Sequence, residues 1–350
     1  MMTSFEWRPC MAAALMLAAA ANLAAQRVRV TETAGIERRR EPVTVEIGGK
    51  ERVVYVSIGA GKTRTFRPGQ LRHGDTIDIR PTDPVGFTVE NSVYLADLSK
   101  RLVGDKPEDS GTLRALTYKR AGVTLKRTQN RMHWAPSFQR AGARGYTSIA
   151  MWDPVQEHSR DEVDGMVRFR RAGWHPLYPE LALEAEYRFF PHVPYFLFSA
   201  TVKVVKPIEM YWLRGQEMTM DALFTHAAWP GADGKAVVAA FDERAEAVAR
   251  NPLAVDMPWI VFLNRERGYA FGAVTLGYEA TTVANAKMSI NDGANNGKYW
   301  DRYYVGQTAT TLRPGDRYHE RTAYVLARDL DEFLAWEKKL RNPLRVEVMD

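Results

Sequence analysis

Residues 181–212 read LALEAEYRFFPHVPYFLFSATVKVVKPIEMYW, and this stretch decides the fold. From 181 to 189 apolar and polar side chains alternate, which is the period of a half-buried β-strand. Pro191 and Pro194 interrupt the pattern, a second alternating run spans 195–204, and Pro207 precedes a third run. Turns this short join antiparallel neighbours, because parallel strands need long crossover connections. The stretch therefore predicts three consecutive antiparallel strands.

The same alternation recurs along most of the chain. Residues 258–280, PWIVFLNRERGYAFGAVTLGYEA, predict a hairpin, and residues 317–327, RYHERTAYVLA, predict a further strand. Only residues 329–340, DLDEFLAWEKKL, have helical spacing, with Asp329 as the expected N-cap. We expect a mainly β chain that forms a large antiparallel β-sandwich, with few short helices and one C-terminal helix.

Residues 1–25, MMTSFEWRPCMAAALMLAAAANLAA, have the layout of a secretory signal peptide. The apolar run within them is shorter than a membrane span, and no comparable run follows, so no membrane span is expected. We expect export to the periplasm or the cell exterior. The single cysteine, Cys10, lies in this segment, so the mature chain has no thiol and no disulfide. The expected domains are residues 26–85, as N-terminal strands or a small sandwich, and residues 86–350, as the main sandwich.

The balance of charges is mildly basic, with 48 Lys and Arg residues against 42 Asp and Glu, a formal net charge of +6. A mild positive charge suits an acidic polysaccharide or oligosaccharide as partner. The sequence lacks the clustered basic stripe that nucleic-acid binding requires. No HExxH motif or pair of histidines at ligand spacing is present, so we expect no catalytic metal and no cofactor. A structural calcium ion stays open, because an acidic stretch offers carboxylates. These are Asp153, Glu157, Asp161, Glu162 and Asp164.

Three stretches resemble a known superfamily. Residues 87–127 contain two strands around a polar loop, residues 186–218 contain the alternating ladder, and residues 300–326 contain two further strands. They resemble the first hairpin, the central ladder and the closing strands of the galactose-mutarotase-like β-sandwich superfamily. That superfamily houses aldose epimerases and the sandwich domains of several polysaccharide lyases and glycosidases. The resemblance implies a concave sheet face that holds sugars, with acid–base groups projecting from strands. None of the three stretches is a catalytic signature, so site residues must come from local chemistry.

The first candidate cluster is residues 212–229, WLRGQEMTMDALFTHAAW. A polar group bounded by tryptophans suits a sugar subsite, because the rings stack on apolar sugar faces while polar groups bind hydroxyls. Its members are Arg214, Gln216, Glu217, Asp221 and His226, between Trp212 and Trp229. The alternative is a structural loop in which the arginine and the glutamate pair with each other.

Two further clusters are present, and the first of them interleaves arginines with aromatic rings, a pattern that suits a sulfated or uronate-containing glycan. Residues 130–152 supply Asn130, Arg131, His133, Trp134, Arg140, Arg144, Tyr146 and Trp152. Residues 295–304 supply Asn295, Asn296, Lys298, Trp300, Arg302 and Tyr303 as a rim loop. The alternative for the former is that His133 and Trp134 only end a strand.

The leading functional hypothesis is a polysaccharide lyase that cleaves an acidic glycan by β-elimination. Such a reaction needs a base, a group that neutralises the substrate carboxylate, and an acid. The candidates are His226 or His133 as base, Tyr303 or Tyr146 as acid, and Arg214 or Arg302 as neutraliser. The substrate-binding candidates are Trp134, Trp229, Trp300, Glu217, Asn296 and Arg144.

Two alternatives stay open. One is a glycoside hydrolase that uses paired carboxylates, either Glu217 with Asp221 or Glu184 with Glu186. The other is a non-catalytic β-sandwich that only binds a glycan.

Overall fold

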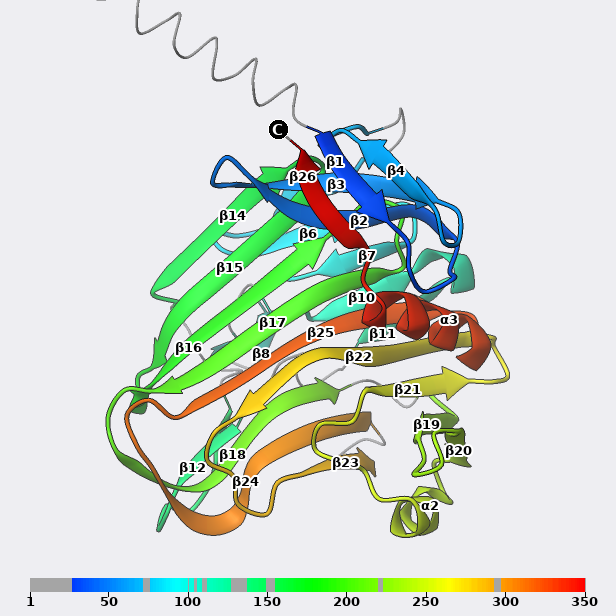
Figure 1. Cartoon of the computed structure of the whole chain (residues 1–350). Helices are drawn as coiled ribbons and strands as arrows, with labels where there is room; N and C mark the ends of the chain where they lie inside the picture. Colours follow the sequence, from blue (N-terminus) through cyan, green and yellow to red (C-terminus); the bar gives the residue numbers. More distant parts are fainter. Residues whose placement is uncertain are drawn as a thin grey trace, which may run out of the picture. The chain divides into compact units, whose positions relative to one another are not determined.

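The structure is a computed structural model (Figure 1). It describes residues 27–71, 76–99, 101–103, 106–108, 112–126, 137–148, 155–219, 223–292 and 297–349. The chain divides into two compact units. The smaller unit takes residues 1–75, 163–165 and 342–350, and the larger unit takes residues 76–162 and 166–341.

The smaller unit contains a three-stranded sheet and a hairpin. The sheet has the order β26 (Arg345–Met349), β1 (Arg27–Thr31), β4 (Thr63–Phe66), and the hairpin joins β2 (Arg38–Ile47) to β3 (Lys50–Ile58). Gly48 and Gly49 form its two-residue turn, and both have positive φ angles, as a tight turn between right-twisted strands requires. The core is small and aliphatic, and its buried members are Val28, Val30, Val45, Ile47, Val54, Val56, Ile58 and Leu344.

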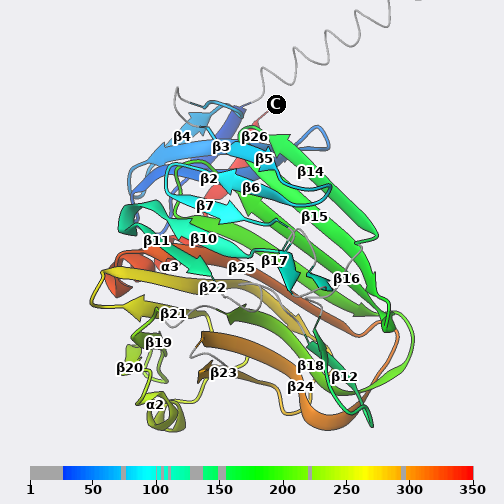
Figure 2. The same ribbon diagram turned by 180° about the vertical axis from the view of Figure 1, so that it is seen from behind.

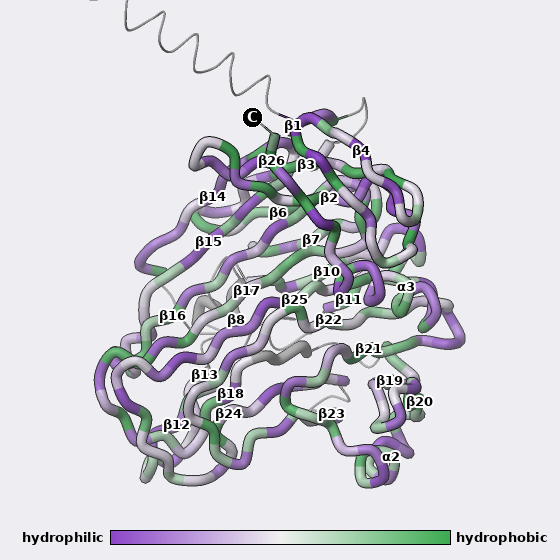
Figure 3. Tube along the Cα trace, in the orientation of Figure 1, coloured by the Kyte–Doolittle hydropathy of each residue, from purple (hydrophilic) through white to green (hydrophobic). Residues whose placement is uncertain are grey.

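The larger unit is built on a nine-stranded antiparallel sheet (Figure 1). Its order is β14 (Glu157–Val163), β15 (Met166–His175), β16 (Tyr178–Phe189), β17 (Tyr195–Val204), β25 (Arg317–Ala327), β22 (Tyr269–Ala280), β21 (Trp259–Asn264), β19 (His226–Pro230), β20 (Ala236–Ala240). Hydrophobic and hydrophilic residues follow one another along β15, β16 and β17 (Figure 3), as expected for strands with one face in a core.

Two five-stranded sheets complete the sandwich. Figure 2 shows the first in front of the large sheet: β11 (Val123–Lys126), β10 (Ala115–Tyr118), β7 (Tyr94–Asp97), β6 (Phe87–Glu90), β5 (Asp78–Pro81). The second is β13 (Thr147–Ser148), β12 (Ser137–Arg140), β18 (Ile208–Thr219), β24 (Lys298–Leu312), β23 (Lys287–Asp292). A separate pair joins β8 (Arg101–Val103) to β9 (Lys106–Glu108).

Aromatic contacts show that both five-stranded sheets pack on the large one. The rings of Phe87 on β6 and Phe169 on β15 lie 4.9 Å apart, centroid to centroid. The rings of Trp300 on β24 and Phe262 on β21 lie 4.7 Å apart in a T-shaped arrangement. One continuous hydrophobic core runs through all three sheets. The expected mainly β sandwich is therefore confirmed.

The helices of the described residues are short: η1 (Lys119–Ala121), α2 (Arg244–Arg250) and α3 (Leu330–Arg341). The predicted C-terminal helix is α3, and Asp329 caps it, since its carboxylate accepts a hydrogen bond from the Glu332 backbone N–H at 2.8 Å. Phe333 anchors the helix in the core, with its ring 5.8 Å from that of Trp259. Within the described residues, none of these helices is long and apolar enough to cross a membrane.

One strand of the deciding stretch does not pair as predicted. β16 and β17 pair from Leu181 opposite Val204 to Phe189 opposite Phe196, as expected. β18 lies in a different sheet, so the prediction of a third antiparallel neighbour was wrong. The reason is that β16 and β25 occupy both edges of β17, so no edge remains for β18.

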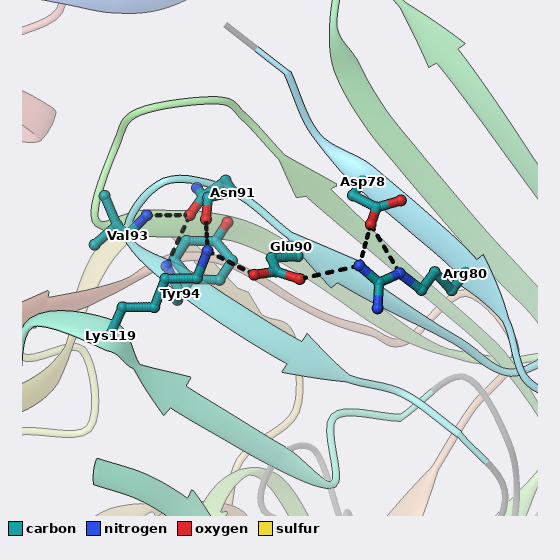
Figure 4. A network of polar contacts seen from close by, with 7 residues as sticks. All are labelled: Asp78, Arg80, Glu90, Asn91, Val93, Tyr94 and Lys119. Carbon is teal, nitrogen blue, oxygen red and sulfur yellow. Dashed lines mark hydrogen bonds and ion pairs between the residues drawn. The ribbon is translucent and has the colours of Figure 1, made fainter. Parts of the chain in front are cut away.

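Asn91 fixes the turn between β6 and β7 (Figure 4). Its side-chain oxygen accepts hydrogen bonds from the backbone N–H groups of Val93 and Tyr94, both at 2.8 Å. Its amide group donates to the carbonyls of Phe190 and Val193, between β16 and β17. The same view shows the chain of ion pairs beside this turn, in which Asp78 contacts Arg80, Arg80 contacts Glu90, and Glu90 contacts Lys119.

Candidate functional site

The residues of β24 point alternately to the two sides of its sheet. Trp300 and Arg302 face the nine-stranded sheet, where they contact Phe262 and Glu320 respectively. Asp301 and Tyr303 point to the opposite face, away from the large sheet. This outer face, shared with β12, β18 and β23, carries the candidate site.

A hydrogen-bond network links four strands on this face. Asp301 is fully buried and accepts hydrogen bonds from the Tyr303 hydroxyl, at 2.8 Å, and from the Ser289 hydroxyl. The Arg214 guanidinium lies 3.2 Å from the same carboxylate and also donates to the Ser137 hydroxyl at 2.8 Å. Arg214 and Tyr303 sit directly opposite each other in the β18–β24 register, between two irregularities of β18. Local β-bulges of this kind re-aim side chains, so the strand geometry helps to place the arginine.

The electrostatics of this network favour the protonated phenol. Burial, followed by the neighbouring Asp301, raises the pKa of the Tyr303 hydroxyl well above its ordinary value. Burial also raises the pKa of Asp301, while the Arg214 guanidinium and the hydrogen bonds to the carboxylate oppose that shift. At neutral pH Tyr303 is therefore a hydrogen-bond donor, and the positive charge of Arg214 is directed at a carboxylate of the protein itself.

A pocket of about 400 Å³ opens beside this network. It is lined by Trp212, Asn285, Lys287, Tyr303, Gly306 and Gln307. The Trp212 ring meets that of Tyr303 edge-on at 4.9 Å and stacks with the exposed ring of Tyr146 at 6.4 Å and 16°. The Lys287 ammonium lies 5.7 Å from the centre of the Tyr303 ring. The pocket thus combines an aromatic wall, a cation and several hydrogen-bonding groups.

Two residues of this pocket have a strained backbone. Asn285 and Gln307 have φ angles of 50° and 55°, in the left-handed region that residues other than glycine rarely adopt. The Asn285 amide donates to the Gly306 carbonyl at 3.2 Å, and Ala284 bridges to Val305, which holds this segment against β24. Such strain tends to occur where a binding site imposes the backbone conformation.

The structure brings together some of the predicted residues. Arg214, Tyr303 and Tyr146 lie on the same face of one sheet, although the sequence placed them in three clusters. Arg144 is exposed in the turn between β12 and β13. His226 lies on β19 in the nine-stranded sheet, bonded to the Thr225 hydroxyl at 2.8 Å, and it does not line the pocket. Its burial lowers the pKa of its imidazole.

Other predicted residues lie in the core. Trp229 and Trp300 are fully buried, and the Trp229 indole donates to the Asn251 carbonyl at 3.0 Å. Arg302 is also fully buried, with its guanidinium 2.7 Å from Glu320. These three side chains face the interior, so in this structure none presents a surface to a ligand.

The remaining predicted residues either lie outside the described part of the chain or form ion pairs. His133, Trp134, Asn296, Asp221 and Asp153 lie outside the described residues, as does the side chain of Glu217. Glu184 and Glu186 lie on one face of β16 and pair with Arg170 and Arg188 at 2.9 and 2.6 Å. Of the calcium candidates, Asp161 pairs with Arg168 and Asp164 with Arg52. Among the described residues, no three His, Cys, Asp or Glu side chains are grouped to hold a metal.

Sequence reasoning missed several members of the site. Asp301 lies within the 295–304 cluster but was not among the predicted residues. Strand alternation places its side chain on the same face as that of Tyr303 and on the other face from that of Trp300. Ser137, Ser289, Lys287, Asn285 and Gln307 carry no local signal, because long-range strand pairing brings them together.

Comparisons with known proteins show the fold. No family model matches the sequence, and no curated protein matches it. A protein of glycosyl hydrolase family 38 from Enterococcus faecalis aligns over 93% of this chain with a TM-score of 0.55 and 10% identity. An alpha-mannosidase from Enterococcus faecalis V583 aligns over 93% with a TM-score of 0.55 and 9% identity. A galactose mutarotase-like protein from Lactobacillus casei aligns over 69%, with a TM-score of 0.42 and 10% identity.

The resemblance seen in the sequence is confirmed at the level of fold. The chain shares its β-sandwich architecture with the two Enterococcus structures. It spans only 47% and 46% of the two Enterococcus chains, and at such low identity the likeness establishes the architecture alone. What the sandwich does must therefore be argued from its own residues.

Proposed function

We propose that this chain is a glycan-binding β-sandwich and that the pocket beside Trp212 and Tyr303 receives a sugar unit. The observation that carries the proposal is the composition of that pocket, with an aromatic wall, fixed hydrogen-bonding groups and a volume of about 400 Å³. Pockets of this size that combine apolar surface with a few placed polar groups are typical small-ligand sites.

The aromatic wall supplies the apolar contact. Trp212 is partly exposed and lines the pocket together with Tyr303, whose ring meets it edge-on. The Tyr146 ring stacks with Trp212 and helps to fix its orientation, but Tyr146 does not line the pocket. Flat rings held in this way can stack on the C–H face of a pyranose at little entropic cost, because neighbouring rings already fix their orientation.

The polar groups supply the specificity. Lys287 is exposed at the pocket, and no carboxylate is among the lining residues, so the pocket carries a positive charge that favours an acidic sugar. The Gln307 amide and the side-chain oxygen of Asn285 can bind hydroxyls, whereas the Asn285 NH2 group already donates to Gly306 and Thr308. This supports the expected preference for an acidic glycan.

The geometry supports binding rather than β-elimination at this pocket. Tyr303 was expected to act as the acid, but its raised pKa makes the phenol a weak acid, and its hydroxyl already donates to Asp301. Arg214 already pairs with the same carboxylate, and no histidine is among the lining residues.

The names of the two Enterococcus structures, a glycosyl hydrolase and an alpha-mannosidase, support a hydrolase-related setting over a lyase. Of the two carboxylate pairs proposed for a hydrolase, Glu184 and Glu186 lie on β16 in the other sheet. The other pair, Glu217 with Asp221, lies outside the described side chains.

The test is calorimetric titration of the whole chain with neutral and uronate-containing oligosaccharides, comparing Trp212→Ala with Trp174→Ala. Trp174 is 49% exposed on β15 and does not line the pocket, so it controls for loss of a surface indole. We expect Trp212→Ala to weaken binding about tenfold or more, which is the scale of a central aromatic contact, while Trp174→Ala keeps the wild-type affinity.

The same samples decide between binding and turnover. New reducing ends that disappear in Trp212→Ala would replace the binding proposal with a hydrolase, and unsaturated ends would replace it with a lyase. Equal affinities for both variants and the wild type would reject the pocket as the site.

A further inference from the structure

Strand pairing sets four polar side chains in a row across the outer face of the second five-stranded sheet. Lys287 on β23 lies opposite Tyr303 on β24. On the other side of β24, Tyr303 lies opposite Arg214 on β18, which in turn lies opposite Ser137 on β12. Side chains directly opposite each other on paired strands start about 5 Å apart, so neighbours in such a row can touch. The row thus puts the cation of the pocket, Lys287, next to Tyr303.

A buried carboxylate lies beside this row without lining the pocket. Asp301 is two residues from Tyr303 on β24, so both side chains point to the same face of the sheet. Asp301 is fully buried, and it is not among the residues that line the pocket beside Trp212. A buried carboxylate is costly unless hydrogen bonds compensate the loss of water. The donors that compensate it therefore show what this carboxylate holds in place.

Three donors from three strands converge on Asp301. They are the Tyr303 hydroxyl on β24, at 2.8 Å, the Ser289 hydroxyl on β23, and the Arg214 guanidinium on β18, at 3.2 Å. Of these three donors, Tyr303 alone lines the pocket. The hydrogen bond between Tyr303 and Asp301 is therefore the link from the buried network to the surface that a ligand meets.

This hydrogen bond fixes the position of the Tyr303 ring. The ring turns about two side-chain torsions, and a bond at its far end restrains both of them. In the restrained position the ring meets that of Trp212 edge-on at 4.9 Å, and the Lys287 ammonium lies 5.7 Å from its centre. A cation is attracted to an aromatic face. Within the described part of the chain Lys287 forms no ion pair, so this ring is the contact that orients its ammonium group.

We propose that Asp301 is a positioning residue that sets the preference of the pocket for acidic sugars. Asp301 holds the Tyr303 ring, and the ring holds the Lys287 ammonium where the acidic group of the sugar binds. Asp301 itself does not touch the sugar. The inference rests on the function proposed for the pocket beside Trp212, and it assigns the selectivity of that pocket to a residue buried beneath it.

The test is a double-variant cycle in the full chain, measured as calorimetric affinity for a uronate-containing and a neutral oligosaccharide of equal length. The variants are Asp301→Asn, Tyr303→Phe and the two combined. Tyr303→Phe keeps the ring and removes the hydroxyl, whereas Asp301→Asn keeps the size of the side chain and removes the charge that strengthens the hydrogen bond. We expect each single variant to weaken binding of the acidic sugar about three- to tenfold, the scale of one hydrogen bond.

The double variant should bind the acidic sugar no more weakly than Tyr303→Phe alone, because Asp301 acts through the Tyr303 hydroxyl. The neutral sugar should lose less affinity than the acidic one, since a hydroxyl gains less from the Lys287 ammonium than a carboxylate does. The ratio of the acidic to the neutral affinity should therefore fall, which a general loss of stability would not produce.

Asp97→Asn is the matched control. Asp97 on β7 also accepts hydrogen bonds from a serine hydroxyl and an arginine, those of Ser99 and Arg114, but it lies in the other five-stranded sheet. We expect this variant to keep both affinities, and their ratio, at the wild-type values.

Two results would overturn the proposal. One is an unchanged ratio of the two affinities in Tyr303→Phe, which decides the question even where Asp301→Asn does not fold. The other is a double variant in which the two single losses add, since Asp301 would then act by a route other than Tyr303.

Trp212→Ala in the same titrations separates this inference from the proposed function. Wild-type affinity in Trp212→Ala would show that the pocket is not the sugar site, and both proposals would fail. Weakened binding in Trp212→Ala together with additive losses in the cycle would leave the pocket as the site and reject only the role of Asp301.

Discussion

Replacement of Arg302 by methionine should destabilise the larger unit strongly, although the sequence proposed Arg302 as a catalytic residue. Arg302 is fully buried, and its guanidinium lies 2.7 Å from the Glu320 carboxylate. It also donates to the Val255 carbonyl at 2.7 Å and to the Thr275 hydroxyl at 3.3 Å. The variant removes the cation and leaves a carboxylate that is only 2% exposed without its partner.

The expected loss in the free energy of unfolding is about 3–5 kcal/mol, which is the usual cost of breaking one side of a buried ion pair. For a domain of this size, that corresponds to a fall in Tm of roughly 6–20 °C. The double variant Arg302→Met/Glu320→Leu removes both charges and should recover most of the loss, because apolar residues can replace a buried pair at little cost.

The loss in the free energy of unfolding of Arg302→Met should also depend on pH. Burial raises the pKa of Glu320, and the variant removes the cation that opposes this shift. The folded state then binds a proton that the unfolded state releases, so the stability of Arg302→Met should fall as pH rises from 5 to 8.

The assay is urea unfolding at pH 5 and pH 8, with Arg317→Met as control. Arg317 pairs with Glu279 on the surface of the same sheet, where an ion pair contributes about 0–1 kcal/mol. A loss in Arg302→Met no larger than in this control would refute the reasoning. So would a double variant that is no more stable than the single one.

Two further predictions follow from the packing and the charges. Gly215→Ala should lower the free energy of unfolding by about 1–3 kcal/mol, because an added Cβ would lie 2.4 Å from the Tyr304 ring, and urea unfolding measures the loss. The smaller unit should lose stability as pH falls from about 4.5 towards 2. Burial alone would raise the pKa of Glu32, but hydrogen bonds from backbone N–H groups, led by that of Gly61, lower it to about 2. The carboxylate therefore stabilises the folded state until it is protonated, and Glu32→Gln should remove this pH dependence of stability in an acid titration.

The local pattern predicted the positions of the strands well, but it did not predict which sheet each strand joins. Alternation along 181–204 is enough to predict β16, β17 and their register, since the connection between them is short. It could not place β18, because the second edge of β17 is taken by β25, more than a hundred residues later in the chain. Sheet membership is set by such distant pairings, which the local sequence does not encode.

The candidate site was predictable in its residue types and not in its geometry. Arg214 and Tyr303 were both proposed, and strand pairing places them opposite each other. Trp300 and Arg302 were proposed from the same segment, but alternation sends them to the core, beside Phe262 and Glu320. Both faces of β24 are buried near its start, so hydropathy alone does not tell which face meets a ligand.

The most direct test of the account is a crystal structure of the chain with a bound oligosaccharide. We predict a sugar ring against Trp212 in the pocket that it lines with Tyr303, with the polar groups of the sugar within hydrogen-bond distance of Lys287, Asn285 or Gln307. A sugar bound to the larger unit at another place, such as the Glu184 and Glu186 face of β16, with the pocket beside Trp212 empty, would contradict the central claim.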